Sequence, residues 1–197
     1  ELGVPSNPTI VAAGDAVAVQ LRRAAIDALL ADDEPDTLVA LLRKLHHDST
    51  RRSVTDAIDR IVSGLYDVYR QAPREELWTT LRVPDTLLAP PDLATAVAKL
   101  GEAATLIPSD KVWAKAWRNG YDAATAGDWD GFLASGIATK IAAGETTFSR
   151  RTIGSDVLDV YQPLIEHAMA YLVGRVKSQT QATFDLLQRF DAHYTRL

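Results

Sequence analysis

The chain has 197 residues, enough for one ordinary domain or two small ones. Hydrophobic residues make up 47% and charged residues 24%, a globular composition that excludes disorder of the whole chain. The absence of cysteine excludes disulfides, thiolate catalysis and cysteine-ligated metals. Because 21 Lys and Arg residues stand against 26 Asp and Glu residues, the net charge is -5, and neither nucleic acid nor a membrane is an expected partner.

The first residues, 1–13, predict an extended segment. The chain begins at Glu1 instead of Met, so we expect a processed protein or a part of a longer one. The opening lacks the basic and apolar regions of a secretory signal, and no apolar run approaches the roughly 18 residues that span a bilayer. A signal removed earlier would leave no trace, and we take a cytoplasmic location as the default expectation.

Residues 14–82 predict an N-terminal helical part. Apolar residues at steps of three and four predict a helix that Asp15 caps and that ends at the acidic break 32–35. A second helix is expected over 35–45, a third after 48–50, and a short one over 74–81.

Residues 83–91 contain three of the nine prolines and predict a linker, after which 92–197 form a C-terminal helical part; both parts together can also be one domain. Helices are expected over 92–106, from Asp110, from the turn at 127–128 to 144, and over 155–194. Pro163 would kink the last of these, or lie in its first turns if the helix starts later. Period-two alternation is absent, so no strands are predicted. The fold class is therefore all-α, a bundle of seven to nine helices with a long C-terminal helix.

One turn resembles the helix–turn–helix of a tetratricopeptide unit. The residues that carry this resemblance are Gly120, Ala123, Gly127, Asp128, Trp129 and Phe132. In that family, small residues allow two helices to approach closely, and a Gly-Asp-aromatic turn reverses the chain. The pattern does not recur 34 residues away on either side, so we expect a single helical hairpin and no repeat array.

Near the C-terminus, Arg189 and His193 resemble the Arg-x4-6-His signature of HEPN ribonucleases, which are all-α and cleave RNA without a metal. Here three residues separate Arg from His, and Phe190 stands where a polar residue is usual. The two side chains still share one helix face. The resemblance implies acid–base catalysis by Arg189 and His193; the alternative is an exposed pair at a helix end.

An aromatic stripe, Trp113, Trp117 and Tyr121, recurs at every fourth position, with Lys111, Lys115 and Arg118 on neighbouring faces. Such a stripe is typical of a helix core, and it can also line a pocket that binds a small molecule. These three aromatic residues are therefore the candidate ligand-binding residues of a sensor domain.

Other motif fragments favour structural roles. The string Asp32-Asp33-Glu34-Pro35-Asp36 resembles the magnesium motif of class I terpene cyclases, but its proline breaks the helix, which favours an acidic turn. The four histidines form no metal-ligand pattern, so no metal and no cofactor are predicted.

Two segments resemble each other: Arg51-Arg52-Ser53 and Arg150-Arg151-Thr152 each precede an Asp. Both are expected at helix starts, where Asp56 and Asp156 accept hydrogen bonds from the free backbone N–H groups. The alternative explanation for their similarity is that one half of the chain is a duplicate of the other.

These observations favour a non-catalytic helical interaction or regulatory domain that binds a protein partner or itself. The alternatives are a HEPN-like ribonuclease and a small-molecule sensor, and the identity of any small molecule stays open.

Overall fold

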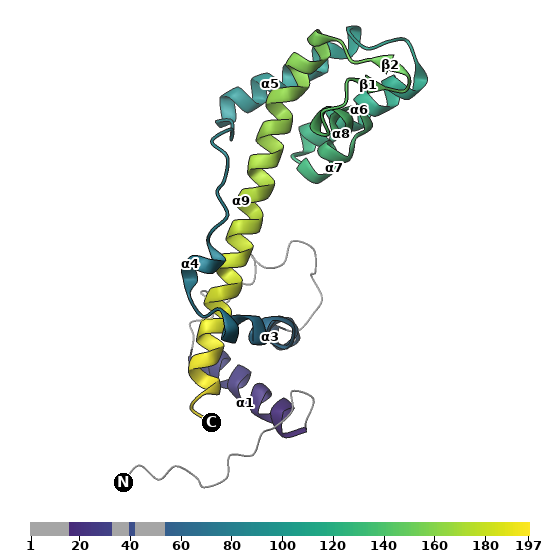
Figure 1. Cartoon of the computed structure of the whole chain (residues 1–197). Helices are drawn as coiled ribbons and strands as arrows, with labels where there is room; N and C mark the ends of the chain where they lie inside the picture. The colour runs from purple at the N-terminus through teal and green to yellow at the C-terminus, as the bar shows by residue number, and fades with distance from the viewer. Residues whose placement is uncertain (1–15, 33–39, 42–53) are drawn as a thin grey trace, which may run out of the picture. The chain divides into compact units, whose positions relative to one another are not determined.

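The computed structural model describes residues 16–32, 40–41 and 54–197 (Figure 1). The described residues form these elements: α1 (Ala16–Asp32), α3 (Val54–Gln71), α4 (Glu75–Trp78), α5 (Pro90–Glu102), the 3-10 turn η1 (Ala103–Thr105), α6 (Lys111–Ala126), α7 (Trp129–Ala134), α8 (Gly136–Ala142), β1 (Thr147–Phe148), β2 (Arg151–Thr152) and α9 (Ser155–Tyr194). The all-α prediction is confirmed, including the long C-terminal helix. No described helix combines the length and apolar character needed to cross a bilayer.

Some predictions lie outside the described residues. They concern the extended segment 1–13, the cap at Asp15, the acidic string after Asp32, most of the helix over 35–45, the cap region 48–50 and the segment 51–53.

The structure divides into two compact units. Unit 1 comprises the described residues up to Thr80 together with Ser178–Leu197, and unit 2 comprises Leu81–Lys177. The boundary after Thr80 falls close to the predicted linker. The second boundary lies inside α9, so the end of the chain joins the N-terminal helices.

In unit 1, α1, α3 and the end of α9 share one apolar core. Among its most deeply buried members are Ile26, Leu29, Ile58, Leu186 and Phe190, each at most 1% exposed. Apolar residues recur at helical spacing in each of the three segments, which is why the sequence predicts their helices. Burial of such side chains stabilises the unit by roughly 2 kcal/mol each.

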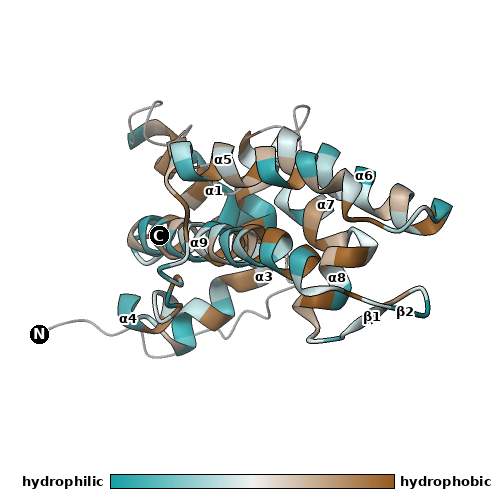
Figure 2. Ribbon diagram, turned by 90° about the horizontal axis from the view of Figure 1, so that it is seen from above, coloured by the Kyte–Doolittle hydropathy of each residue, from teal (hydrophilic) through white to brown (hydrophobic). Residues whose placement is uncertain are grey.

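In unit 2, α6 and α7 form the predicted helix–turn–helix. The Asp110 side chain caps α6 by accepting the Val112 N–H at 2.7 Å, and Gly127 ends α6 with a left-handed φ of 70°. The side chain of Asp128 then accepts the Gly131 N–H at 2.9 Å and starts α7. Figure 2 shows polar and apolar residues alternating along α6, as expected of a helix with one buried face.

The prediction of one helix from the 127–128 turn to Gly144 is wrong, because the chain breaks at Ser135. This residue is extended, with ψ of 134°, and separates α7 from α8. Its hydroxyl donates to the carbonyl of Phe132 at 2.7 Å. A Cβ at Gly120 would come within 3.0 Å of the Ser135 Oγ, so the absent side chain lets α6 approach this break closely.

The expected helix start at Arg150-Arg151-Thr152 is also wrong. Strands β1 and β2 pair in an antiparallel hairpin, with Thr147 opposite Thr152 and Phe148 opposite Arg151. The turn residues Ser149 and Arg150 both have positive φ, 47° and 63°. Helix α9 begins at Ser155, after the hairpin, and Asp156 lies in its first turn as predicted.

The proline-rich residues predicted as a linker pack against α9 within unit 2. The Thr86 hydroxyl donates to the Glu166 carbonyl at 3.1 Å, and the Leu88 N–H donates to the His167 Nδ1 at 3.0 Å. We call residues 81–89 the 81–89 segment.

Candidate ligand-binding cavity

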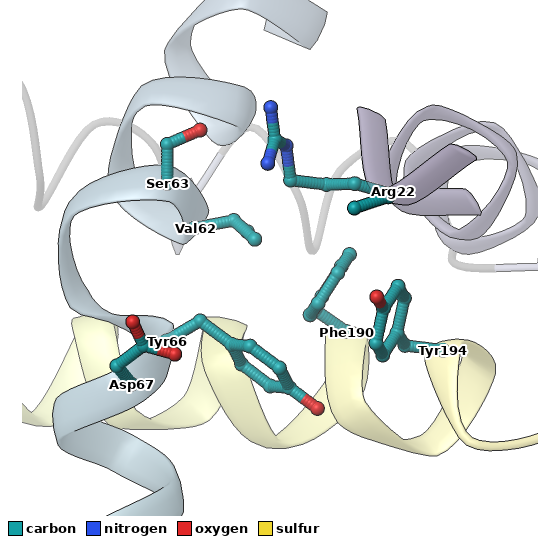
Figure 3. A pocket seen from close by; sticks show the side chains of 8 residues that line it. Arg22, Val62, Ser63, Tyr66, Asp67, Phe190 and Tyr194 are labelled. Carbon is teal, nitrogen blue, oxygen red and sulfur yellow. The ribbon is translucent and has the colours of Figure 1, made fainter. Parts of the chain in front are cut away.

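A cavity of about 330 Å³ lies between α1, α3 and the end of α9 in unit 1 (Figure 3). Three helices far apart in the sequence supply its walls. The lining residues are Ala18 and Arg22 from α1, Val62, Ser63, Tyr66 and Asp67 from α3, and Phe190 and Tyr194 from α9. We call it the α1–α3–α9 cavity.

Three aromatic rings hold one another in place along this cavity. The Tyr66 ring meets Phe190 edge to face at 5.0 Å and Tyr194 at 5.6 Å, while Phe190 and Tyr194 stack at 5.2 Å. Edge-to-face and stacked pairs of this kind stabilise each other by about 1 kcal/mol beyond area burial. The aromatic wall is therefore fixed before any ligand binds.

Polar groups from α1 and α3 also border the cavity. The Arg22 Nε donates to the Asp59 Oδ1 at 2.8 Å, which orients the guanidinium. Ser63 and Asp67 are exposed, so their side chains lie where the cavity opens to solvent. The cavity thus combines apolar ring faces with a cation, a hydroxyl and a carboxylate.

The Tyr66 phenol is fixed by a hydrogen bond that it donates to Asp191. Burial, and then this hydrogen bond, raise the pKa of Tyr66 to about 12. Arg70 lies beside the same carboxylate oxygen, with its Nη1 3.6 Å from the Asp191 Oδ1. The phenol therefore stays protonated at neutral pH and serves as a fixed wall, not as a base.

Sequence reasoning missed this cavity. Phe190 and Tyr194 are four residues apart on one helix, and that spacing was a signal of a shared face. Their partners Arg22 and Tyr66 come from segments more than a hundred residues away, and no local pattern connects them.

The predicted pair Arg189 and His193 lies on the same helix as Phe190 and Tyr194. Neither residue belongs to the cavity lining. The His193 Nδ1 is 3.8 Å from the Asp32 Oδ2, with the imidazole largely covered and the carboxylate exposed. Catalysis by this pair stays a prediction.

The aromatic stripe of α6 is divided between two sets of contacts. Trp113 is 1% exposed and meets Phe148 edge to face at 5.1 Å. Trp117 and Tyr121 stack on each other at 5.6 Å, and the Trp117 Nε1 donates to the Leu100 carbonyl of α5 at 2.9 Å. The three rings fill space between helices, and ligand binding by them stays a prediction.

Across the described residues, no group of three or more His, Asp or Glu side chains is placed to hold a metal ion. Comparisons with protein families, with curated proteins and with solved structures find no match for this chain.

Proposed function

We propose that this chain is a non-catalytic helical regulatory domain whose α1–α3–α9 cavity binds a small organic molecule. The observation that carries the proposal is a cavity of about 330 Å³ with three mutually fixed aromatic rings and a few polar groups. Pockets for small molecules are typically about 300–1,000 Å³, mostly apolar, with a few polar groups that fix orientation.

The polar groups support binding more than turnover. Tyr66 is held protonated by burial and by Asp191, and Arg22 is oriented by Asp59. A catalytic acid or base needs a pKa near the working pH, whereas the raised pKa of Tyr66 keeps its phenol protonated. Tyr66 and Arg22 can orient a ligand through hydrogen bonds, and the Tyr66 phenol has no proton to exchange at neutral pH.

The chemistry of the walls favours a ligand with a planar apolar part and one anionic or hydrogen-bonding group. The planar part would lie against the half-buried rings of Tyr66 and Tyr194, and the polar group would lie near Arg22.

Native mass spectrometry of protein purified from its own organism tests this proposal. We expect an additional mass of a few hundred daltons on the 197-residue chain. Ala18 lines the cavity and is buried, so Ala18→Phe should fill it and abolish the additional mass. Ala31→Phe is the matched control, because Ala31 is an exposed residue of the same helix and should leave the additional mass in place.

Two results would contradict the proposal. The first is a chain that carries no additional mass and whose melting temperature does not rise when a small-molecule extract of the same cells is added. A ligand that binds only the folded state would raise that temperature. The other is a retained mass that Ala18→Phe does not change, because that ligand would lie elsewhere.

The ribonuclease hypothesis makes the opposite prediction for activity. If it is right, the purified chain cleaves single-stranded RNA in excess EDTA, and His193→Ala abolishes the cleavage. We expect intact RNA in both samples, and EDTA-resistant cleavage that depends on His193 would overturn the non-catalytic assignment.

A protein partner or self-association, and a cytoplasmic location, remain part of this proposal. A regulatory domain passes its ligand signal to another surface, and the size of the assembly in the same native spectra reports whether that surface is a second copy.

A further inference from the structure

A second concave surface lies in unit 2, far along the chain from the α1–α3–α9 cavity. It is an open groove of about 460 Å³ between α6, the start of α8 and β1. The residues that line it are Lys111, Val112, Lys115, Ala116 and Asn119 from α6, Gly136 from α8 and Phe148 from β1. We call it the α6–β1 groove.

The floor of the groove is apolar and rigid. Val112 is 52% exposed although it lies beside the fully packed Trp113. Phe148 packs edge to face on Trp113, and a Cβ at Gly136 would come within 2.8 Å of the Phe148 ring. The ring therefore lies directly against the backbone of α8 and cannot move inward. A fixed apolar floor reduces the ordering cost of binding an apolar side chain.

The rim of the groove is positively charged. Lys111 and Lys115 are four residues apart on α6 and so share a face. Arg151 lies opposite Phe148 in the hairpin register, and paired residues of a hairpin present their side chains on the same face. Lys111 and Lys115 thus line the groove beside Val112, and the register places Arg151 on the face of the hairpin that carries Phe148.

These cations lack acidic partners in unit 2, all of whose residues the structure describes. Neither Lys111, Lys115 nor Arg151 forms an ion pair there. Other cations of the same unit are paired: Lys140 Nζ is 2.9 Å from a Glu145 oxygen, and Arg175 Nη2 is 2.8 Å from Asp130. The carboxylate nearest in sequence, Asp110, already accepts the Val112 N–H as the helix cap.

We propose that the α6–β1 groove binds a segment of another protein that has one large apolar side chain flanked by Asp or Glu. The apolar side chain fits against Val112 and Phe148, and the flanking carboxylates complement the three cations of the rim. Complementary charge around an apolar anchor is the usual anatomy of a specific protein interface.

The groove favours a protein segment over a nucleic acid. Stacking platforms for bases need several exposed ring faces, and the groove lining offers one ring, Phe148, which packs edge to face on Trp113. The net charge of -5 also opposes a long polyanion, whereas a short acidic segment needs only the local cations.

Fluorescence anisotropy with labelled peptides tests the proposal. The probe is a fluorescein-labelled nine-residue peptide with a central Leu and two Glu residues on each side, set between Gly residues. Three comparison probes replace the Leu by Ser, replace every Glu by Lys, or substitute an oligouridylate of equal charge. We expect saturable binding of the Leu/Glu peptide and at least about tenfold weaker binding of the other three.

Variants locate the binding on the groove. Lys111→Glu combined with Lys115→Glu should weaken binding of the Leu/Glu peptide by about tenfold or more, and Val112→Ser by about fivefold. All three positions are exposed, so circular dichroism should show unchanged folding. Lys99→Glu is the matched control, since Lys99 is an exposed cation of α5 outside the groove, and it should change affinity less than about twofold.

Three results would overturn the inference. The first is no saturable binding of the Leu/Glu peptide at millimolar concentration. The second is an affinity that the double lysine variant and Lys99→Glu lower equally, which would indicate nonspecific charge attraction. The third is tighter binding of the oligouridylate, which would indicate a nucleic-acid surface.

Discussion

His167 joins the 81–89 segment to α9, and we predict that it makes unit 2 sensitive to acid. Its side chain is 4% exposed, its ring meets Trp129 edge to face at 4.6 Å, and its Nδ1 accepts the Leu88 N–H at 3.0 Å. An Nδ1 that accepts this hydrogen bond cannot carry a proton. Burial accordingly lowers the pKa of His167 from its ordinary value of 6.5.

The sign of the effect follows from proton linkage. As the pH falls below 6.5, the unfolded chain takes up a proton on this histidine while the folded chain does not, so the free energy of unfolding decreases. For each pH unit between 6.5 and the lowered pKa of the folded state, the free energy of unfolding decreases by about 1.4 kcal/mol. At pH 5.5 the loss attributable to His167 is therefore at most about 1.4 kcal/mol, and below the folded pKa it no longer grows.

Urea unfolding at pH 7.5 and at pH 5.5, followed by circular dichroism, measures this loss. His167→Asn is the informative variant, because its amide oxygen can take the place of Nδ1 and does not titrate. The variant loses the Trp129 contact and is less stable at both pH values, but its free energy of unfolding should fall less between pH 7.5 and pH 5.5, by a difference of at most about 1.4 kcal/mol. Since every other titrating group is shared, an equal pH dependence in both chains would refute the assignment of a neutral, accepting His167.

Two further predictions concern strained or unpaired groups of unit 2. The Tyr161 hydroxyl is fully buried and has no hydrogen-bond partner among the described atoms, so Tyr161→Phe should raise the free energy of unfolding by about 1 kcal/mol in urea titrations. A loss of stability would mean that the hydroxyl is hydrogen-bonded after all. Arg150 has a φ of 63°, a left-handed conformation that glycine adopts without strain. Arg150→Gly should therefore raise the free energy of unfolding by about 1 kcal/mol, and the melting temperature with it. A lower melting temperature would show that the turn does not require positive φ at this position.

The sequence predicts best those elements whose signals are local. The expected helix over 155–194 coincides with α9, because apolar spacing persists along the whole segment and continues past Pro163. The α6–α7 turn was predictable as well, since Gly127 supplies the left-handed cap and Asp128 the next N-cap. In both cases the residues that determine the backbone conformation lie within the same short stretch of sequence.

The errors have nonlocal causes. The break at Ser135 lies against Gly120, from another helix, and no pattern within 127–144 marks that approach. The hairpin turn at Ser149 and Arg150 lacks the Asn-Gly or Gly-rich pattern that usually marks such turns, and strands of two residues show no alternation. The 81–89 segment, predicted as a linker from its prolines, also hydrogen-bonds to α9 about 80 residues later, and no local pattern reveals that contact.

The candidate site illustrates the same limit for function. A stripe of aromatic residues on one helix, such as Trp113, Trp117 and Tyr121, shows that the helix has an apolar face, and neighbouring helices cover such a face during folding. A cavity needs side chains that several elements hold apart, as Arg22, Tyr66 and Phe190 do from three helices. No spacing within one helix encodes that arrangement. The long C-terminal helix was visible from the sequence, but which of its aromatic residues meet a core and which border a cavity was determined by its partners.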